Sequence, residues 1–404
     1  MQTGIVIKSE YFLFALFVIS IYFSTSLSTI LSVFIGLQWL FSGRFMALPR
    51  VLRCCPVALW ALLLFGSFIV GLTYNSTTLQ EGLAMVNKYR ELFFIPVLMG
   101  FVSTERFRYW LWNAFIIASI ATLLGSSLMD AGILELNKLG DPCFKSRITH
   151  SIFIAFFAFF CAHKVFQEQR YRPLYLIAMA FCLYNLFFVV QGRTGQLVII
   201  GLALLFAWQR FNGKGRLLAI VVIASLLALF VNFSDKTSRL KEGIENTQAY
   251  LKPVPEQVDS SMGLRYGFWK NSLILMSGKP LLGYGTGSFT KEYQRLVGDK
   301  EFATTNPHNE FLMIGVQLGV LGVLVYVGFL WSQFQCARQL AKPEKWLAQG
   351  LLLCLLITSV FNSPFLDHAE GHWFAVLIAL CFAPIYKPGV PPGEDSPPIS
   401  RPGL

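Results

Sequence analysis

Charged residues are scarce in this chain of 404 residues. Asp, Glu, Lys and Arg together make up 14% of it, whereas soluble domains carry about 25%. Hydrophobic residues make up 55%, and the mean hydropathy is +0.57. These values exclude an ordinary soluble globular domain and predict an integral membrane protein.

Acidic residues are nearly absent from the middle of the apolar runs. Ion-coupled transporters usually need ionisable groups inside the membrane, so this class of protein is disfavoured. The outer loops contain no Asp-x-Asp pair, and the chain has no Walker or Gly-x-Ser-x-Gly motif. The eight cysteines include the adjacent Cys54 and Cys55 but follow no metal-binding or redox spacing. We therefore expect no metal, no cofactor and no structural disulfide.

The basic residues are better explained by topology than by a nucleic-acid partner. The formal net charge is +11, yet Lys and Arg cluster in short loops between apolar runs, as they do on the cytoplasmic side of membrane proteins. We expect membrane lipids, and no nucleic acid, to contact this chain.

The apolar runs predict an all-α polytopic protein with about twelve transmembrane helices, each needing roughly 20 residues to cross a bilayer. The run over 91–104 is short and contains Pro96, which is compatible with a broken or tilted helix. The predicted spans are 11–24, 26–42, 57–74, 91–104, 109–129, 149–165, 172–190, 195–209, 216–233, 309–332, 346–362 and 371–386.

The loop charges predict the orientation of these spans. If the N-terminus is inside, the short inner loops hold more than twice as many basic residues as the short outer loops. Both termini are then cytoplasmic, and 234–308 faces the periplasm of a bacterial inner membrane. The predicted divisions are spans one to nine in 1–233, a periplasmic loop over 234–308, spans ten to twelve in 309–386, and a disordered cytoplasmic tail over 387–404.

The loop over 234–308 has the composition of short amphipathic helices lying at a membrane surface. Helices are predicted over Thr237–Leu251 and Met262–Met276, and Ser288 is placed to cap a third. Between them, Gly283, Gly285 and Gly287 lie in a segment better explained by unusual backbone angles than by a dinucleotide site.

The loop ends at His308, in the run Asn306-Pro307-His308-Asn309. With Pro307 at the first helical position and Asn306 or Thr305 as cap, His308 is predicted in the first turn of the next span. A neutral imidazole there, at the positive end of a helix and beside an anion site, is suited to general-base catalysis. The alternative is a histidine that only ends a span, and the neighbouring Glu310 either orients a partner or is solvated.

Several outer cations are suited to binding phosphate. Arg193 lies in a tight outer turn, and Arg265 lies on the polar side of 262–276 with Trp269 one turn later. A guanidinium matches phosphate in bidentate geometry. The alternatives are that Arg193 reaches lipid headgroups and that Arg265 is simply solvated. Two further outer pairs bind either a polyanion or headgroups: Lys88 with Arg90, and Lys145 with Arg147.

These motifs together resemble the O-antigen ligase family. The resemblance rests on Gly192-Arg193-Thr194-Gly195, Arg265, the segment from Gly283 to Phe289, and the segment from Pro307 to Leu312, within about 150–330. It implies a metal-independent, inverting glycosyltransferase with a GT-C-like membrane fold. The donor would be a glycan on undecaprenyl diphosphate, and the acceptor a sugar hydroxyl of lipid A–core.

The resemblance also implies residue roles. His308 would activate the acceptor, and Arg193 and Arg265 would bind the diphosphate. The neighbouring Tyr284, Asn309 and Trp269 are further candidates for substrate binding, as are Lys88, Arg90 and Arg147. Two alternatives stay open: an O-antigen polymerase or protein O-oligosaccharyltransferase of the same superfamily, and a transporter of lipid-linked glycan that performs no chemistry.

Overall fold

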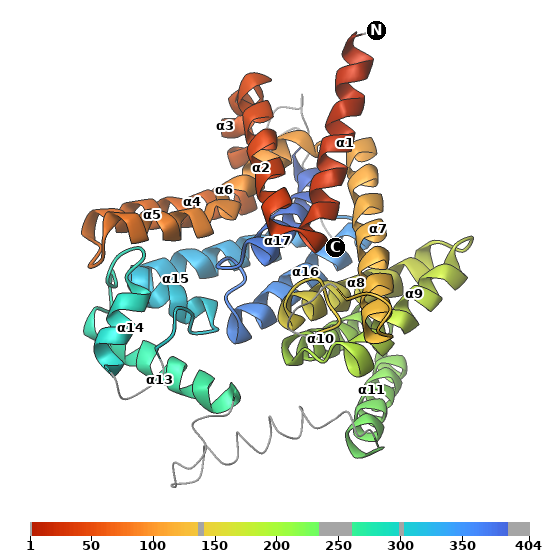
Figure 1. Ribbon diagram of the computed structural model, residues 1–404. Coiled ribbons are helices and arrows are strands. Elements are labelled where there is room, and N and C mark those ends of the chain that lie inside the picture. The colour runs from red at the N-terminus through yellow and green to blue at the C-terminus, as the bar shows by residue number, and fades with distance from the viewer. Residues whose placement is uncertain (1, 136–140, 234–260, 299–302, 387–404) are drawn as a thin grey trace, which may run out of the picture.

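The computed structural model describes residues 2–135, 141–233, 261–298 and 303–386, and all its regular elements are helices (Figure 1). The prediction of an all-α protein is confirmed for this part of the chain. The helices are α1 (Gln2–Phe23), α2 (Thr25–Phe41), η1 (Arg44–Ala47), α3 (Leu48–Cys54), α4 (Pro56–Val70), η2 (Gly71–Tyr74), α5 (Leu79–Lys88), α6 (Arg90–Phe101), α7 (Glu105–Asp130), α8 (Arg147–Gln167), α9 (Arg172–Tyr184), η3 (Asn185–Val189), α10 (Arg193–Arg210), α11 (Gly213–Phe233), α13 (Ser261–Gly278), α14 (Phe289–Val297), α15 (Glu310–Ala337), α16 (Lys342–Phe361), α17 (His368–Phe382) and η5 (Ala383–Ile385).

Seven described helices are long and apolar enough to cross a membrane. An eighth is added if Thr25–Phe41 and Arg44–Cys54, which meet at a bend of 80°, form one span. The chain is therefore a multi-pass membrane protein, while the count of about twelve spans stays a prediction. The short α6 illustrates the difficulty: its 12 residues extend about 18 Å, less than the roughly 30 Å of a hydrocarbon core.

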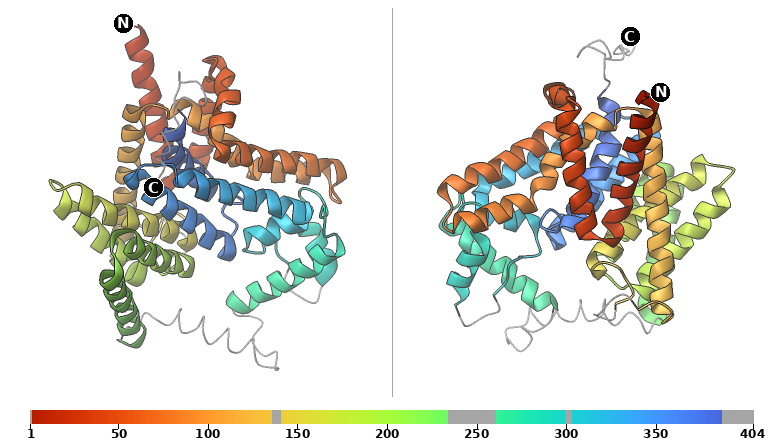
Figure 2. Two further views of the ribbon diagram at one scale, coloured as in Figure 1. Left: turned by 180° about the vertical axis from the view of Figure 1, so that it is seen from behind. Right: turned by 45° about the horizontal axis from the view of Figure 1, so that its top comes forward.

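Helices α8 and α17 form the centre of the molecule. Nearly every side chain of α8 from Thr149 to Cys161 is buried, as is every side chain of α17 from Ala369 to Phe382. A helix that is apolar on all sides is stable only when other helices surround it. Accordingly, α8 packs against α9, α10 and α16, whereas α17 packs against α1, α6 and α16 (Figure 2).

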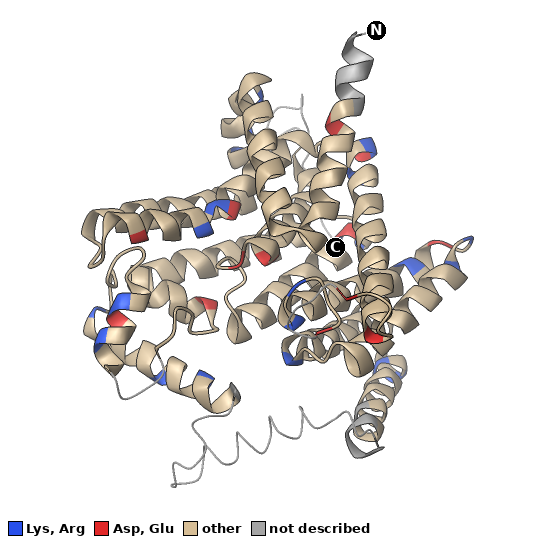
Figure 3. Cartoon of the chain, in the orientation of Figure 1, with Lys and Arg blue, Asp and Glu red and all other residues tan. Residues whose placement is uncertain are grey.

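Charged side chains lie mostly near helix ends (Figure 3). Loops that are predicted on the outer side contact one another: Lys145 Nζ donates to Thr25 Oγ1 at 2.6 Å, and Ser76 N donates to Tyr284 O at 2.8 Å. This grouping is expected if the spans alternate in direction. Which side faces the periplasm stays a prediction.

Helix α15 is broken at Gly319, and residues 280–288, here called the strap, lie across the break. Gly319 has φ 65°, outside the helical region. Tyr284 N donates to Val316 O at 2.9 Å, and Val320 N donates to Pro280 O at 2.8 Å. The strap thus satisfies backbone groups that lose their helical partners at the break. A Cβ on Gly319 would lie 2.2 Å from Leu281 O, so glycine permits this close approach of the strap.

The glycines of the strap adopt the unusual backbone angles that the sequence predicted. Gly283, Gly285 and Gly287 have φ of 67°, 89° and 86°. A Cβ on Gly285 would lie 2.2 Å from Asn75 Cα. The hydroxyl of Thr286 donates to Phe68 O at 2.6 Å, so the strap is wedged between α15 and the end of α4.

The described part of the 234–308 loop contains α13 and α14, which pack on each other and on α15. The helix predicted over 262–276 is confirmed as part of α13. Ser288 occupies the cap position of α14, but its hydroxyl donates to Gly285 O at 2.6 Å and caps no helical amide. The predicted helix over Thr237–Leu251 and the tail 387–404 lie outside the described residues.

Candidate functional site

His308 lies immediately before the cap of α15. Asn309 is the N-cap: its Oδ1 accepts from Leu312 N at 3.0 Å, and the helix begins at Glu310. The prediction that Asn306 or Thr305 caps a helix containing His308 in its first turn is therefore wrong. His308 has φ 53°, and it is the non-glycine residue with positive φ in the described chain. Such strained positions are concentrated at functional sites.

Hydrogen bonds connect the turn around His308 to the last turn of α16 and to the segment that follows it. Asn306 Oδ1 accepts from His308 N at 2.8 Å and from Ser363 Oγ at 2.9 Å. Asn309 Nδ2 donates to Val360 O at 3.0 Å. The imidazole therefore projects from a backbone that is fixed on both sides.

Helix α13 supplies the neighbouring wall of the site. Trp269 Nε1 donates to Pro307 O at 3.0 Å, and the Phe268 ring lies beside the imidazole at 6.5 Å between centroids. Arg265 is one turn before Trp269 and lies on the same face of the helix. The hydrogen bond of Trp269 thus turns the Arg265 face of α13 toward His308.

Electrostatics show that three of the predicted residues converge. Burial and the nearby charge of Arg265 lower the pKa of His308, whereas its hydrogen bond with Asn362 has the opposite effect and raises this pKa. Burial and the nearby Arg193 charge lower the pKa of Arg265. Arg265 therefore lies within electrostatic range of both His308 and Arg193, although the three residues come from separate segments.

Arg193 is the first residue of α10, and close packing on α8 fixes this end of the helix. A Cβ on Gly192 would lie 2.2 Å from Ser151 Oγ and 2.7 Å from Arg147 O, and one on Gly195 would lie 2.3 Å from Ser151 Cβ. Only glycine permits this approach. A short turn is present between η3, which ends at Val189, and α10, but Arg193 begins the helix, whereas the sequence predicted it within the turn.

Arg147 and Asn309 are committed to contacts within the chain. The guanidinium of Arg147 forms an ion pair with Asp141 at 2.8 Å, although its backbone lies beside Gly192. Asn309 uses both ends of its side chain to cap α15 and to hold Val360.

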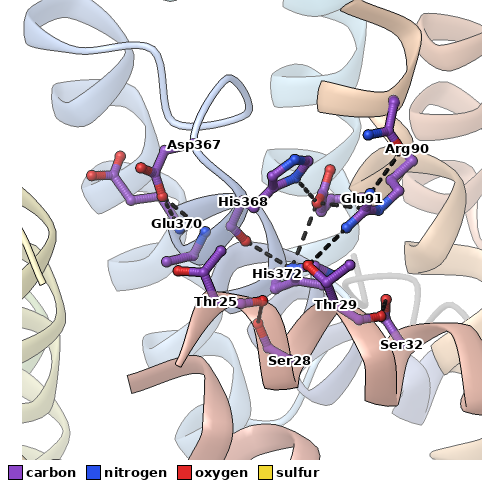
Figure 4. A network of polar contacts seen from close by, with 12 residues as sticks. Thr25, Ser28, Thr29, Ser32, Arg90, Glu91, Asp367, His368, Glu370 and His372 are labelled. Carbon is purple, nitrogen blue, oxygen red and sulfur yellow. Dashed lines mark hydrogen bonds and ion pairs between the residues drawn. The ribbon is translucent and has the colours of Figure 1, made fainter. Parts of the chain in front are cut away.

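The remaining candidates also have contacts of their own. Arg90 donates to Thr29 Oγ1 at 3.1 Å (Figure 4). It also donates to Asn87 Oδ1 at 2.7 Å, and Lys88 is exposed on α5. Tyr284 belongs to the strap, where its ring lies 4.8 Å from the Lys279 ammonium.

Sequence reasoning missed the buried acids beside the site. Glu310 is fully buried and accepts from Tyr89 Oη at 2.6 Å and from Phe365 N at 3.3 Å, so the solvated alternative is wrong. Glu370 is also buried, and Asn362 Nδ2 donates to it at 3.0 Å. The signal was the unusually polar stretch from Asn362 to His372 between two apolar spans. Within the described residues, no group of three or more His, Cys, Asp or Glu side chains is arranged to hold a metal ion.

An apolar groove begins near Arg193. A cavity of about 520 Å³ lies between α9, η3, α10 and α11, with Leu183, Ile199 and Ala203 in its wall. A second cavity of about 400 Å³ shares these three residues and extends to α8. Ile199 is six residues, or about 9 Å, along α10 from Arg193.

Part of this chain matches a known protein family. Residues 176–327 match the model of a protein family described as O-Antigen ligase. The resemblance to the O-antigen ligase family is confirmed. The matched range contains Arg193, Arg265 and His308. The chain is also similar to an uncharacterized protein of Haemophilus influenzae, with 22% identity over 341 residues that cover 79% of this chain and 83% of the relative.

Proposed function

We propose that this protein transfers O-antigen glycan from undecaprenyl diphosphate to a sugar hydroxyl of lipid A–core at the periplasmic face of the inner membrane. The observation that supports the proposal is that the charge of Arg265 lies near both His308 and Arg193. The match to the O-antigen ligase family supports a glycosyltransferase of this kind.

The two guanidinium groups suit a diphosphate. Arg193 and Arg265 carry like charges, and the charge of one lowers the pKa of the other within a partly buried site. Bringing like charges together is unfavourable, and a bound anion reverses this cost. A diphosphate carries enough negative charge to engage both groups, each in bidentate geometry.

The reaction follows from the placement of base and cations. Nε2 of His308 takes the proton of the acceptor hydroxyl, and the hydroxyl oxygen forms a bond to the anomeric carbon of the donor. The bond between that carbon and the diphosphate oxygen breaks, and the electron pair leaves with the diphosphate. Arg193 and Arg265 stabilise the developing negative charge. One displacement inverts the anomeric carbon.

The groove between α9, α10 and α11 suits the polyprenyl chain of the donor. Its wall is apolar, and it starts about two turns along α10 from Arg193. The lipid and the diphosphate are thereby accommodated by one helix.

Variants in a strain that lacks the native gene test this function. His308→Ala, Arg193→Ala and Arg265→Ala are each expected to abolish O-antigen capping of lipopolysaccharide while the protein remains in the membrane. Removing a general base costs about 10²- to 10⁴-fold in rate, and removing a cation at the leaving group about 10²- to 10³-fold. Lys270→Ala, on an exposed part of α13, is the matched control and is expected to cap normally.

The same experiment distinguishes the alternatives. Capping by single repeat units in the deletion strain indicates a polymerase, and loss of a glycoprotein with normal lipopolysaccharide indicates a protein O-oligosaccharyltransferase. Normal capping by all three variants contradicts the proposed roles of these residues.

A further inference from the structure

A second polar side chain lies behind His308. Asn362 follows α16 and is buried, and its Oδ1 lies 3.3 Å from His308 Nδ1. Its Nδ2 lies 3.0 Å and 3.3 Å from the two carboxylate oxygens of Glu370. Since an ionised carboxylate only accepts hydrogen bonds, an ionised Glu370 takes them from the NH₂ of Asn362 and thereby fixes the orientation of the amide. The oxygen of Asn362 must then face His308.

This orientation selects the protonation state of the imidazole. An amide oxygen only accepts hydrogen bonds, so the proton of neutral His308 is on Nδ1. Nε2 is left with a lone pair, which is the form that a general base requires. When Nε2 takes a proton, the imidazolium is stabilised by the oxygen of Asn362.

Glu370 is itself held in place. Thr149 Oγ1, in the first turn of α8, donates to Glu370 Oε1 at 2.8 Å, and Ser146 Oγ lies 2.8 Å from Thr149 Oγ1. Glu370 N donates to Asp367 Oδ1, which caps α17. Helices α8 and α17 are the most buried helices of the fold, so the carboxylate is supported by the rigid centre of the molecule.

A neighbouring acid provides a natural comparison. Glu91 is buried like Glu370 and contacts His368 Nδ1 at 2.7 Å and Arg90 Nε at 3.7 Å (Figure 4). Both acids lie against the first turn of α17, but Glu370 is the one joined through Asn362 to His308. If both acids only stabilised the fold, replacing either one would have the same effect on the protonation of His308.

We propose that Asn362 and Glu370 are positioning residues, which hold His308 with its proton on Nδ1 and thereby keep Nε2 available to the acceptor hydroxyl. The catalytic part of this inference rests on the proposed glycan transfer, whereas the positioning of the imidazole does not depend on it.

Nitrogen NMR of the whole protein tests the positioning without any substrate. The chain has five histidines, and with ¹⁵N-labelled histidine the signal of His308 is identified by its loss in His308→Gln. The native protein is expected to show protonated Nδ1 and unprotonated Nε2 at neutral pH. Asn362→Ala is expected to remove this preference, and Glu91→Gln to leave it unchanged. A native His308 with its proton on Nε2 overturns the inference, even if no variant folds.

Kinetics test the consequence for transfer. Asn362→Ala and Glu370→Gln are expected to lower the rate by about 10- to 100-fold. Losses of this size are typical when the hydrogen-bond partner that orients a functional histidine is removed, as at metal sites of other proteins. They should also move the acid limb of the pH profile to lower pH, because the protonated imidazole loses the hydrogen bond that stabilises it. Glu91→Gln is expected to change neither. Equal behaviour of Glu370→Gln and Glu91→Gln overturns the role of Glu370.

The two measurements separate the inference from the proposed function. If the native protein shows the expected Nδ1–H form and Asn362→Ala loses it, yet no glycan is transferred, the proposed function fails and the positioning of His308 is supported.

Discussion

At the scale of the residue, His308 is unusual in both its backbone and its side chain. Its φ is positive, and it precedes α15 rather than belonging to the first turn of that helix. Partial burial and the charge of Arg265 keep the imidazole neutral at lower pH than usual. Both features favour a base over a histidine that merely ends a span.

The pH dependence of transfer follows from the direction of this pKa shift. The neutral fraction of His308 grows as pH rises through its pKa, so activity should rise with pH and reach half of its plateau below about 6.5, the ordinary pKa of histidine. Arg265→Gln removes a positive charge that lowers this pKa, so the acid limb of the residual activity should move to higher pH. Lys270→Gln should leave the limb in place. A limb that moves downward in Arg265→Gln contradicts this account of the site.

The strained backbone of His308 gives a second prediction. Glycine adopts positive φ freely, whereas a residue with a Cβ does so at a cost of about 1 kcal/mol. His308→Gly and His308→Ala both remove the imidazole, but only the glycine variant relieves the strain. We expect the glycine variant to have the higher Tm in detergent and both variants to be inactive. A lower Tm for the glycine variant would show that the strain is absent.

The residues of the site were only partly predictable from the sequence. Arg193, Arg265 and His308 stand out because they are polar groups in loops between apolar spans. Their convergence was not predictable, because it depends on how α10 and α13 pack. Asn362 and Glu370 were missed because a buried polar side chain looks like a solvated loop residue until its partners are known.

At the scale of the element, the strap and the broken helix α15 depend on each other. The break frees backbone groups at Val316, Gln317 and Val320, and the strap binds them. The sequence predicts the glycine angles of the strap, because only glycine favours them. The sequence does not predict that the strap binds α15, because the free backbone groups of that helix arise only from its break at Gly319.

Substitution of a strap glycine tests this dependence. Gly285→Ala adds both backbone strain, at φ 89°, and a Cβ 2.2 Å from Asn75 Cα. Gly43 has φ 71° with nothing within 4 Å of a Cβ, so Gly43→Ala adds strain alone. We expect Gly285→Ala to lower stability by roughly 1–3 kcal/mol, more than Gly43→Ala, as measured by thermal unfolding in detergent. Equal losses would mean that the strap can move away from Asn75.

At the scale of the whole molecule, the loops fall into two groups that agree with the alternation predicted from charge. On the predicted inner side, the Arg210 guanidinium lies 5.1 Å from the Trp346 ring. On the predicted outer side, Lys145 donates a hydrogen bond to Thr25. The helices themselves were predictable because apolar runs are long and continuous. The number that span was not, because α2 and α6 bend or end within the apolar region.

Labelling of introduced cysteines tests the orientation. Lys279→Cys and Lys342→Cys are exposed positions in loops predicted on opposite sides. A maleimide that cannot cross the inner membrane is expected to label Lys279→Cys in cells with a permeable outer membrane, and Lys342→Cys only after lysis. The unsubstituted protein gives the background from its own cysteines. The reverse pattern would place the site in the cytoplasm.

The central claim is that one protein carries out glycan transfer with residues at the meeting of α10, α13 and α15. Its most direct test is reconstitution of the purified protein in detergent with undecaprenyl-diphosphate-linked glycan and lipid A–core, with transfer followed by the change in mass of the acceptor. The account predicts glycosylated lipid A–core from the native protein and none from His308→Ala. Absence of product from correctly folded native protein, or equal product from His308→Ala, would contradict it.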